Sequence, residues 1–284
     1  MRNLISNGIK KLVDSGPKYS QGDRAGRVIS IATVKGGVGK TTTAVNLACG
    51  LSTFRDARVL LVDLDAQGHC ASSLSDYHVD APGSEPLSEI LLDEEGQQVL
   101  DTVTSTGYDR LDITPADPEL AEAEGRIAQK IGKEVRLRDS LEVTRTHYDY
   151  VIVDCPPNQG NLTINGLIAA DRVLIPTDLS PLSVQGADEL MGTVATVNRR
   201  LDHDLDVLGV LLTRVDKRTS SVNDEVLETI DDAWGELVFD TQIGINSKLK
   251  KSQLAGQPIF EYAPKSRGAD HYRELTDEIA EMLE

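Results

Sequence analysis

The chain has 284 residues, 39% of them hydrophobic, so one large domain with a full core is the simplest expectation. Its formal net charge is −17, because 46 acidic side chains outnumber 29 basic ones. No apolar run approaches the roughly 20 residues of a membrane span, and the start carries no long apolar signal segment, so we expect a cytoplasmic protein. Cys49, Cys70 and Cys155 follow no metal-ligand spacing and fall in or beside the segments of the nucleotide site, and we interpret them as buried or bystander thiols.

The acidic charge has two interpretations. Taken alone, it argues against a nucleic-acid partner, because an acidic protein repels phosphate. Alternatively, it reflects a cell with molar internal salt, where screening acts over about 3 Å and bulk charge says little about partners. The low lysine content and the even spread of acids favour the second interpretation. The placement of basic residues is then more informative than their number.

Residues 1–27 form a polar leader. Apolar residues between Leu4 and Val13 have rough helical spacing beside Lys10 and Lys11, so a short amphipathic helix is one alternative. A solvated, partly disordered arm is the other. We expect residues 28–284 to form a single domain.

A glycine-rich stretch, residues 34–42 (VKGGVGKTT), follows an apolar run at 28–33 that predicts a buried strand. The next segment, 41–51, has apolar residues at helical spacing. A strand, a glycine-rich turn and a helix together form a phosphate cradle, because the backbone N–H groups and the helix N-terminus point at an anion.

Within this loop, Lys40 would reach the terminal phosphates and the Thr41 hydroxyl would help to hold Mg²⁺. Val34 stands where the general pattern has a glycine, and a second lysine, Lys35, follows it. We expect Lys35 to contact phosphate as well, and a neighbouring subunit's nucleotide is one alternative. The remaining phosphate contacts are expected from Gly36, Gly37, Val38, Gly39 and Thr42.

A second apolar run, at 59–62, predicts a strand that ends in Asp63 and Asp65. Ligands bind at the carboxyl ends of strands in open α/β sheets, and alternation places these two acids on one side. Asp63 could support the Mg²⁺ shell, and Asp65 could hold a water in line with the γ-phosphate.

Residues 76–110 are interpreted as a surface excursion with a short helix near 88–92, followed by a strand at 111–114 and a helical segment over about 119–145. The run 148–153 predicts another buried strand, which ends in Asp154. A carboxylate there would orient Mg²⁺ through its water.

The remaining pattern predicts further elements in alternation. Helices are expected at 160–170, about 181–200, about 220–233 and about 269–283, and strands at 172–177, 207–213 and near 238–242. The densest basic cluster near the end is Lys248, Lys250 and Lys251. The alternation predicts an α/β fold with a doubly wound, mostly parallel sheet flanked by helices, a Rossmann-like three-layer sandwich of the P-loop NTPase type.

The ordered motifs resemble one family, the ParA/Soj partition ATPases of the deviant Walker group, which also contains MinD. The resemblance rests on residues 35–42 (KGGVGKTT), 63–68 (DLDAQG) and 154–157 (DCPP), and on the familial C-terminal stretch 257–269. It covers about residue 28 to the C-terminus.

This resemblance implies a slow ATPase that uses ATP and Mg²⁺ and forms a homodimer around ATP, with Lys35 crossing to the partner's nucleotide. Asp65 matches the family's water-positioning acid. The dimer is expected to bind double-stranded DNA non-specifically on the nucleoid, and a ParB-like protein is expected to stimulate hydrolysis during plasmid or chromosome partition. By position, Arg218 and Lys248 match DNA-contacting residues, with Lys250 and Lys251 as supporting candidates.

The sequence departs from the family pattern in two places, and three alternative functions have to be weighed. Gly244 and Ile245 replace a common proline and a common basic residue, so no adenine contact is assigned there, and the leader is too short for an operator-binding domain. A MinD-like membrane switch is disfavoured by the acidic C-terminal helix. An iron–sulfur relative needs paired cysteines at a dimer face, and we expect none of the three cysteines to be placed so. A cargo-positioning ATPase remains an alternative.

Overall fold

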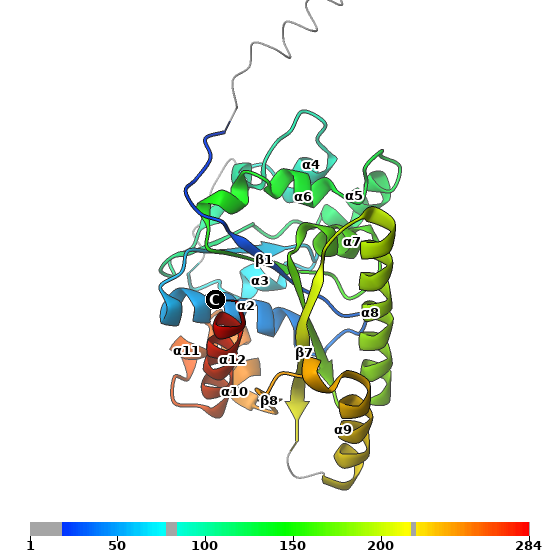
Figure 1. Cartoon of the computed structure of the whole chain (residues 1–284). Helices are drawn as coiled ribbons and strands as arrows, with labels where there is room; N and C mark the ends of the chain where they lie inside the picture. Colours follow the sequence, from blue (N-terminus) through cyan, green and yellow to red (C-terminus); the bar gives the residue numbers. More distant parts are fainter. Residues whose placement is uncertain (1–18, 78–83, 217–219, 284) are drawn as a thin grey trace, which may run out of the picture.

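The computed structural model describes residues 19–77, 84–216 and 220–283. These residues form an eight-stranded sheet in the order β3-β4-β2-β5-β1-β6-β7-β8. β3 pairs antiparallel with β4, and the other pairs are parallel. Helices cover both faces of the sheet, so the three-layer α/β architecture predicted from the alternating pattern is confirmed (Figure 1).

The strands are β1 (Arg27–Ile31), β2 (Val59–Asp63), β3 (Thr104–Ser105), β4 (Leu111–Ile113), β5 (Tyr150–Asp154), β6 (Arg172–Asp178), β7 (Asp206–Val215) and β8 (Ile243–Gly244). The helices are α2 (Lys40–Arg55), α3 (His69–Ser73), α4 (Leu87–Leu92), α5 (Leu120–Ile127), α6 (Arg136–Leu141), α7 (Asn161–Ala169), α8 (Pro181–Leu201), α9 (Ser220–Trp234), α10 (Ser247–Leu254), α11 (Ile259–Tyr262) and α12 (Arg267–Leu283). Short 3₁₀ turns are η1 (Val99–Asp101), η2 (Thr144–His147) and η3 (Gly235–Leu237).

The central strands are buried on both faces, and their side chains alternate between two apolar cores. In β2, Leu60 and Val62 join the core under α4 to α9, whereas Val59 and Leu61 join the core under α2, α10, α11 and α12. Figure 1 shows α8 on one side of the sheet and the α2–α12 pair on the other. This two-sided burial explains why the strands are continuous apolar runs in the sequence.

The predicted elements are largely confirmed, with several corrections. The helical segment expected over 119–145 is divided into α5, α6 and η2. Gly132, between α5 and α6, has a φ of +67°, which is incompatible with a continuing right-handed helix. The two-residue strand β3 and the five-residue helix α3 were not expected, because such short elements carry no periodic signal.

The last strand was also misplaced, because the chain pairs at 243–244 and not over 238–242. Val238 makes a single bridge to Val210. The N–H groups of Asp240 and Thr241 instead donate to the carboxylate of Glu278 on α12, at 2.8 and 3.0 Å. These two backbone N–H groups are therefore bonded to α12 and do not extend the pairing of the sheet.

The leader is described from residue 19 onward, and the helix considered around residues 4–13 lies outside the described residues. Arg24 forms an ion pair with Asp149, and its N–H donates to the carbonyl of Thr146 at 2.9 Å. Residues 19–26 therefore lie against the body of the domain before β1 begins.

Parallel register brings the carboxyl ends of five strands to one edge. Asp63 at the end of β2 is opposite Asp154 at the end of β5, and Asp154 is also opposite Ile31 of β1. On the other side of β1, Asp178 of β6 is opposite Thr213 of β7. The glycine-rich loop leaves β1 in the middle of this row.

Candidate nucleotide and metal site

The glycine-rich loop turns sharply between β1 and α2. Gly37 and Gly39 have φ values of +82° and +88°, in the left-handed region that side chains disfavour. Gly39 is the N-cap of the 16-residue helix α2, and no side chain caps that end. The first N–H groups of α2 and its partial positive charge are thus available to an anion, as the sequence predicts.

Lys40 and Thr41 both face the end of β5. The Thr41 hydroxyl donates to Asp154 Oδ2 at 2.6 Å, and Lys40 Nζ lies 3.8 Å from Asp154 Oδ1. Lys40 and Asp154 are buried. The Thr41 hydroxyl and the Lys40 ammonium at the start of α2 thus both contact the Asp154 carboxylate at the end of β5.

Asp63 is the second buried carboxylate at this edge. It accepts the N–H groups of Asp65 and Cys70, each at 3.0 Å. Burial, and next the charge of Asp154, raises the pKa of Asp63 to about 7. Burial likewise raises the pKa of Asp154, although Lys40 and the hydrogen bonds from Thr41 and Cys70 oppose the shift.

This donor set fits a hard divalent cation. Two carboxylates and the Thr41 hydroxyl supply oxygen atoms, which Mg²⁺ prefers. Asp154 Oδ1 is buried and makes no hydrogen bond. A metal-bound water would satisfy that oxygen and offset the negative charge.

Cys70, expected to be a buried or bystander thiol, is buried, and its Sγ donates to Asp154 Oδ2 at 3.4 Å. Burial, followed by the charges of Asp63 and Asp154, raises its pKa well above the usual value. Among the described residues, Asp63, Cys70 and Asp154 have donor atoms within 4.8 Å of one another. The thiol is thus a neutral neighbour of the carboxylate pair, and sequence spacing gave no signal of this contact.

A cleft of about 570 Å³ opens beside the loop. Gly36, Gly37, Gly39, Lys40, Thr41 and Thr42 line it on one side. Asp65, which is half-buried, lines it as well, so the expected phosphate-contacting stretch and the expected water-positioning acid share one cavity. Asp63 and Asp154 lie beneath it.

Helix α10 closes the same cleft from the C-terminal part of the chain. Lys250, Gln253 and Leu254 line it, and Gln253 Nε2 donates to the Thr42 hydroxyl at 2.8 Å. Lys250, expected only at a DNA face, thus also borders the phosphate loop. Sequence distance hid this contact, because 211 residues separate Gln253 from Thr42.

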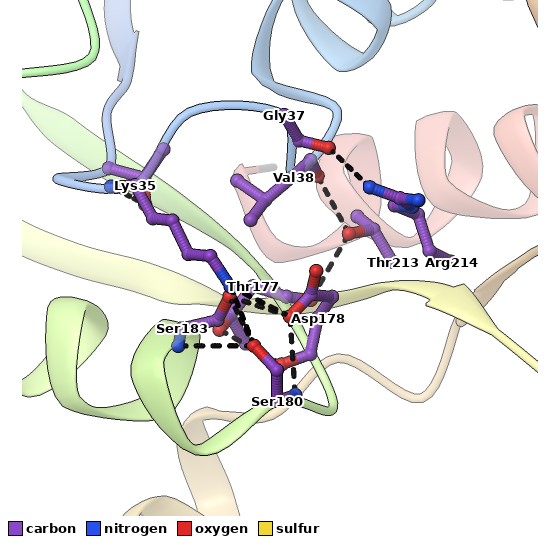
Figure 2. Close-up of polar contacts among 10 residues, drawn as sticks. Lys35, Gly37, Val38, Thr177, Asp178, Ser180, Ser183, Thr213 and Arg214 are labelled. Carbon is purple, nitrogen blue, oxygen red and sulfur yellow. Dashed lines mark hydrogen bonds and ion pairs between the residues drawn. The ribbon is translucent and has the colours of Figure 1, made fainter.

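Lys35 is not among the residues that line this cleft. Its Nζ donates to Ser180 Oγ at 2.7 Å and lies 3.8 Å from Asp178 Oδ1, at the end of β6 (Figure 2). The structure therefore separates Lys35 from Lys40 and Asp65, with which the sequence grouped it. Asp178 and Ser180 carried no motif that would have identified them.

The end of β7 holds the loop from the other side. Thr213 Oγ1 lies 2.7 Å from the Val38 carbonyl and 3.1 Å from the Thr177 carbonyl. Arg214, at a φ of +53°, donates from Nη1 to the Gly37 carbonyl at 3.0 Å (Figure 2). Two consecutive carbonyls are thus turned toward β7, which leaves the loop's N–H groups to face the cleft.

The basic residues of α10 are on the surface. Lys248, Lys250 and Lys251 are all exposed, and the Asn246 side chain caps the helix by accepting from the Lys248 N–H at 2.8 Å. Arg218 lies outside the described residues. A second cleft, of about 810 Å³, lies at the ends of β7 and β8 and includes Asp216, Gly244, Asn246 and His271 in its lining.

Comparison with known proteins agrees with this geometry. A family model described as an AAA domain matches residues 26–207. The Bacillus subtilis sporulation initiation inhibitor protein Soj is 41% identical over 255 residues, covering 90% of this chain and 98% of Soj. The Myxococcus xanthus chromosome partitioning protein ParA is 38% identical over 265 residues, covering 92% of each chain.

A solved structure has the same fold and was crystallised with an ATP analogue and magnesium. A Mycobacterium smegmatis protein described as cobyrinic acid a,c-diamide synthase, solved with an ATP analogue and magnesium, has a TM-score of 0.75 and 33% identity. The match covers 91% of this chain and 96% of that one. The eight-stranded fold, the glycine-rich loop with its two lysines and the relatives together show that the chain belongs to the ParA/Soj family of P-loop ATPases.

Proposed function

We propose that this protein is an ATP- and Mg²⁺-dependent switch that forms a dimer with ATP, binds DNA without sequence preference and drives plasmid or chromosome partition with a ParB-like partner. The observation that carries the proposal is the contact between the basic helix α10 and the phosphate loop. Through it, the state of the nucleotide can bias a surface that is suited to DNA.

For nucleotide binding, residues 36–42 would hold the phosphates, with Lys40 on the terminal ones. Thr41 would contact Mg²⁺ directly, while Asp154 and Asp63 would act through its waters. Asp154 Oδ1, which is buried and makes no hydrogen bond, supports this arrangement. Magnesium supplies positive charge that offsets the charge developing on the transferred phosphoryl group.

For hydrolysis, Asp65 would orient the attacking water from the wall of the cleft, with Lys35 reaching the nucleotide of the partner. Slow turnover without an activator suits a switch, because the ATP-bound state must persist.

For DNA, the proposed contacts are Lys248, Lys250 and Lys251 on α10, with Arg218 as a further candidate. A net charge of −17 opposes DNA binding, so the local concentration of lysines must overcome a repulsive average. Such binding should weaken steeply with salt.

The alternative is a MinD-like or cargo-positioning ATPase that acts on a membrane or a protein assembly. α12 buries its apolar residues, among them Leu275 and Ile279, and exposes Glu274 and Glu281. A negatively charged outer face is unsuited to anionic lipid. In the part of the chain that the structure describes, no helix has both the length and the apolar character needed to cross a membrane.

The test is duplex-DNA binding by the wild type, Asp65→Ala and Lys35→Ala, with ATP, with ADP and without nucleotide, across a salt series. We expect binding only with ATP, retained in Asp65→Ala and lost in Lys35→Ala. A Lys248→Ala/Lys251→Ala variant should lower the affinity about ten-fold or more at low salt, because phosphate contacts are lost.

Arg126→Ala is the matched control, because it removes an exposed charge from α5 on the opposite face of the sheet. It should bind DNA as the wild type does. DNA binding in no nucleotide state would contradict the proposal and favour the membrane or protein-assembly alternative, which co-sedimentation with anionic liposomes would then test.

A further inference from the structure

The side chain of Lys35 has a built receptor on its own subunit. The receptor is formed by Asp178, Ser180 and Ser183, at the end of β6 and the start of α8 (Figure 2). A chain of hydrogen bonds runs from Lys35 Nζ to Ser180 Oγ at 2.7 Å, from Ser180 Oγ to Ser183 Oγ at 3.0 Å, and from Ser183 Oγ to Asp178 Oδ1 at 2.6 Å. Every hydroxyl both accepts and donates, so the bonds reinforce one another.

Hydrogen bonds within the receptor also connect its residues to one another. Ser180 is the N-cap of α8, and its backbone N–H donates to Asp178 Oδ1 at 3.2 Å. Burial alone would raise the pKa of Asp178, but hydrogen bonds from Ser180 and Ser183 and the charge of Lys35 hold it below its usual value. The carboxylate is therefore ionised at neutral pH, opposite the ammonium.

Packing also fixes the backbone that carries the lysine. A Cβ added at Gly186 of α8 would lie 3.7 Å from Val34 Cβ, 3.9 Å from Lys35 N and 4.0 Å from Lys35 Cβ, so α8 lies close to this part of the loop. Lys35 is one-third exposed, so its ammonium is reachable by solvent while it is held. It points toward β6 and not into the cleft that Lys40 lines.

We propose that Asp178 and Ser180 are positioning residues that hold Lys35 on its own subunit, and that this hold must be released before the lysine can reach a phosphate. The proposal rests on the proposed function, in which Lys35 serves the nucleotide of a partner subunit. The hold stabilises the monomer relative to the ATP-bound dimer. It thereby sets the protein concentration at which ATP produces dimers.

The first experiment needs no nucleotide. Pulse acetylation of lysines, read by peptide mass spectrometry, reports how freely each amine reacts. In Ser180→Ala and Asp178→Asn we expect Lys35 to react about three-fold faster or more than in the wild type, because one hydrogen bond or one opposite charge is lost. Ser180→Thr keeps the hydroxyl and should restore the wild-type rate. Asp188→Asn removes an exposed acid from α8 and should leave the rate unchanged.

The second experiment measures ATP-dependent dimerisation against protein concentration, with each substitution placed in Asp65→Ala to slow hydrolysis. Each protomer must release its own Lys35 when the dimer forms, so the free-energy change of one release enters the dimerisation equilibrium twice. We expect the dimer dissociation constant to fall about 3- to 30-fold in Asp178→Asn and Ser180→Ala. A residue with only a structural role would weaken the dimer instead.

The outcomes are distinguishable. Unchanged labelling of Lys35 in both variants overturns the hold, whatever the dimer does. Faster labelling with a weaker or unchanged dimer overturns the claim that the hold opposes dimerisation. If the parent protein forms no dimer with ATP, the proposed function fails, and the labelling result alone decides whether Asp178 and Ser180 restrain the lysine. Thermal unfolding of each variant checks that the fold is retained.

Discussion

At the scale of single residues, Asp63 and Asp154 form a pair of neighbouring buried carboxylates. Both side chains are buried, and the ammonium of Lys40 lies 3.8 Å from only one of them. In a nucleotide-free protein this arrangement opposes ionisation of the second carboxylate, which is why the pKa of Asp63 rises to about 7. The two carboxylates therefore suit a cation that binds with the nucleotide, and without that cation they lower the stability of the folded protein.

This arrangement predicts that the nucleotide-free protein loses stability as the pH rises. A carboxyl with a raised folded-state pKa binds more protons folded than unfolded, so its contribution is fully present below the unfolded pKa and is lost as the pH rises through about 7. The shift sets an upper limit of about 4 kcal/mol on the loss.

The measurement is the free energy of unfolding of the wild type and Asp63→Asn between about pH 5 and 8, with chelator and without nucleotide. We expect the wild type to lose stability relative to Asp63→Asn across this range. Asp188→Asn, on the surface of α8, should follow the wild type at every pH. A difference between wild type and Asp63→Asn that does not change with pH would contradict the raised pKa.

At the scale of elements, the phosphate loop is held by the strands on the far side of β1 and not by its own sequence alone. β7 supplies Thr213 and Arg214, which bond the Val38 and Gly37 carbonyls, and the same hydroxyl reaches the Thr177 carbonyl of β6. Because the Thr213 hydroxyl has one proton, the Val38 carbonyl of the loop and the Thr177 carbonyl of β6 share it. The loop conformation thus depends on how β6 and β7 pair.

Thr213→Val keeps the shape of this side chain and removes its donor. We expect ATP to bind about five-fold more weakly or worse and the protein to lose about 1–3 kcal/mol of stability, because buried carbonyls lose their partner. Fluorescent-nucleotide titration and denaturant unfolding measure the two effects.

Thr229→Val is the matched control, since Thr229 is an exposed residue of α9 whose hydroxyl bonds the Glu225 carbonyl of its own helix. It should change neither quantity. Wild-type ATP affinity in Thr213→Val would show that the loop holds its conformation without β7.

At the scale of the whole molecule, the charge is distributed unevenly. The net charge is −17, yet α10 carries three exposed lysines, whereas the outer face of α12 carries Glu274 and Glu281. Several surface ion pairs, such as Lys130 with Glu94, are exposed and contribute little individually. Self-repulsion among the excess acids therefore acts on the folded state as a whole.

We expect the melting temperature to rise between about 0.1 and 1 M KCl, because the Debye length falls from about 10 to 3 Å and repulsion is screened. DNA binding should weaken over the same range, because its attraction depends on phosphate contacts by the lysines of α10 and by Arg218. Differential scanning fluorimetry and the DNA titration can share one set of buffers. A melting temperature that falls with KCl would mean that attractive ion pairs outweigh the repulsion, and would argue against adaptation to a salt-rich cell.

Local patterns carried much of the fold and of the nucleotide site. Strands buried on both faces must be continuous apolar runs, so β1, β2, β5 and β6 were identifiable. The backbone angles at Gly37 and Gly39 require glycine, and the acids at strand ends follow from the common edge of a parallel sheet. These are short-range constraints, and a sequence states them directly.

Tertiary structure decided what depends on contacts between distant segments. The donors of Asp240 and Thr241 went to Glu278 on α12, which moved the last strand, and Gln253 of α10 reached Thr42 in the phosphate loop. The Lys35 side chain lies against Asp178 and Ser180 and not in the cleft, and the tertiary packing of the loop against β6 and α8 determines this position. A flexible lysine can reach several anions, so its residue type fixed the charge while the fold fixed the partner.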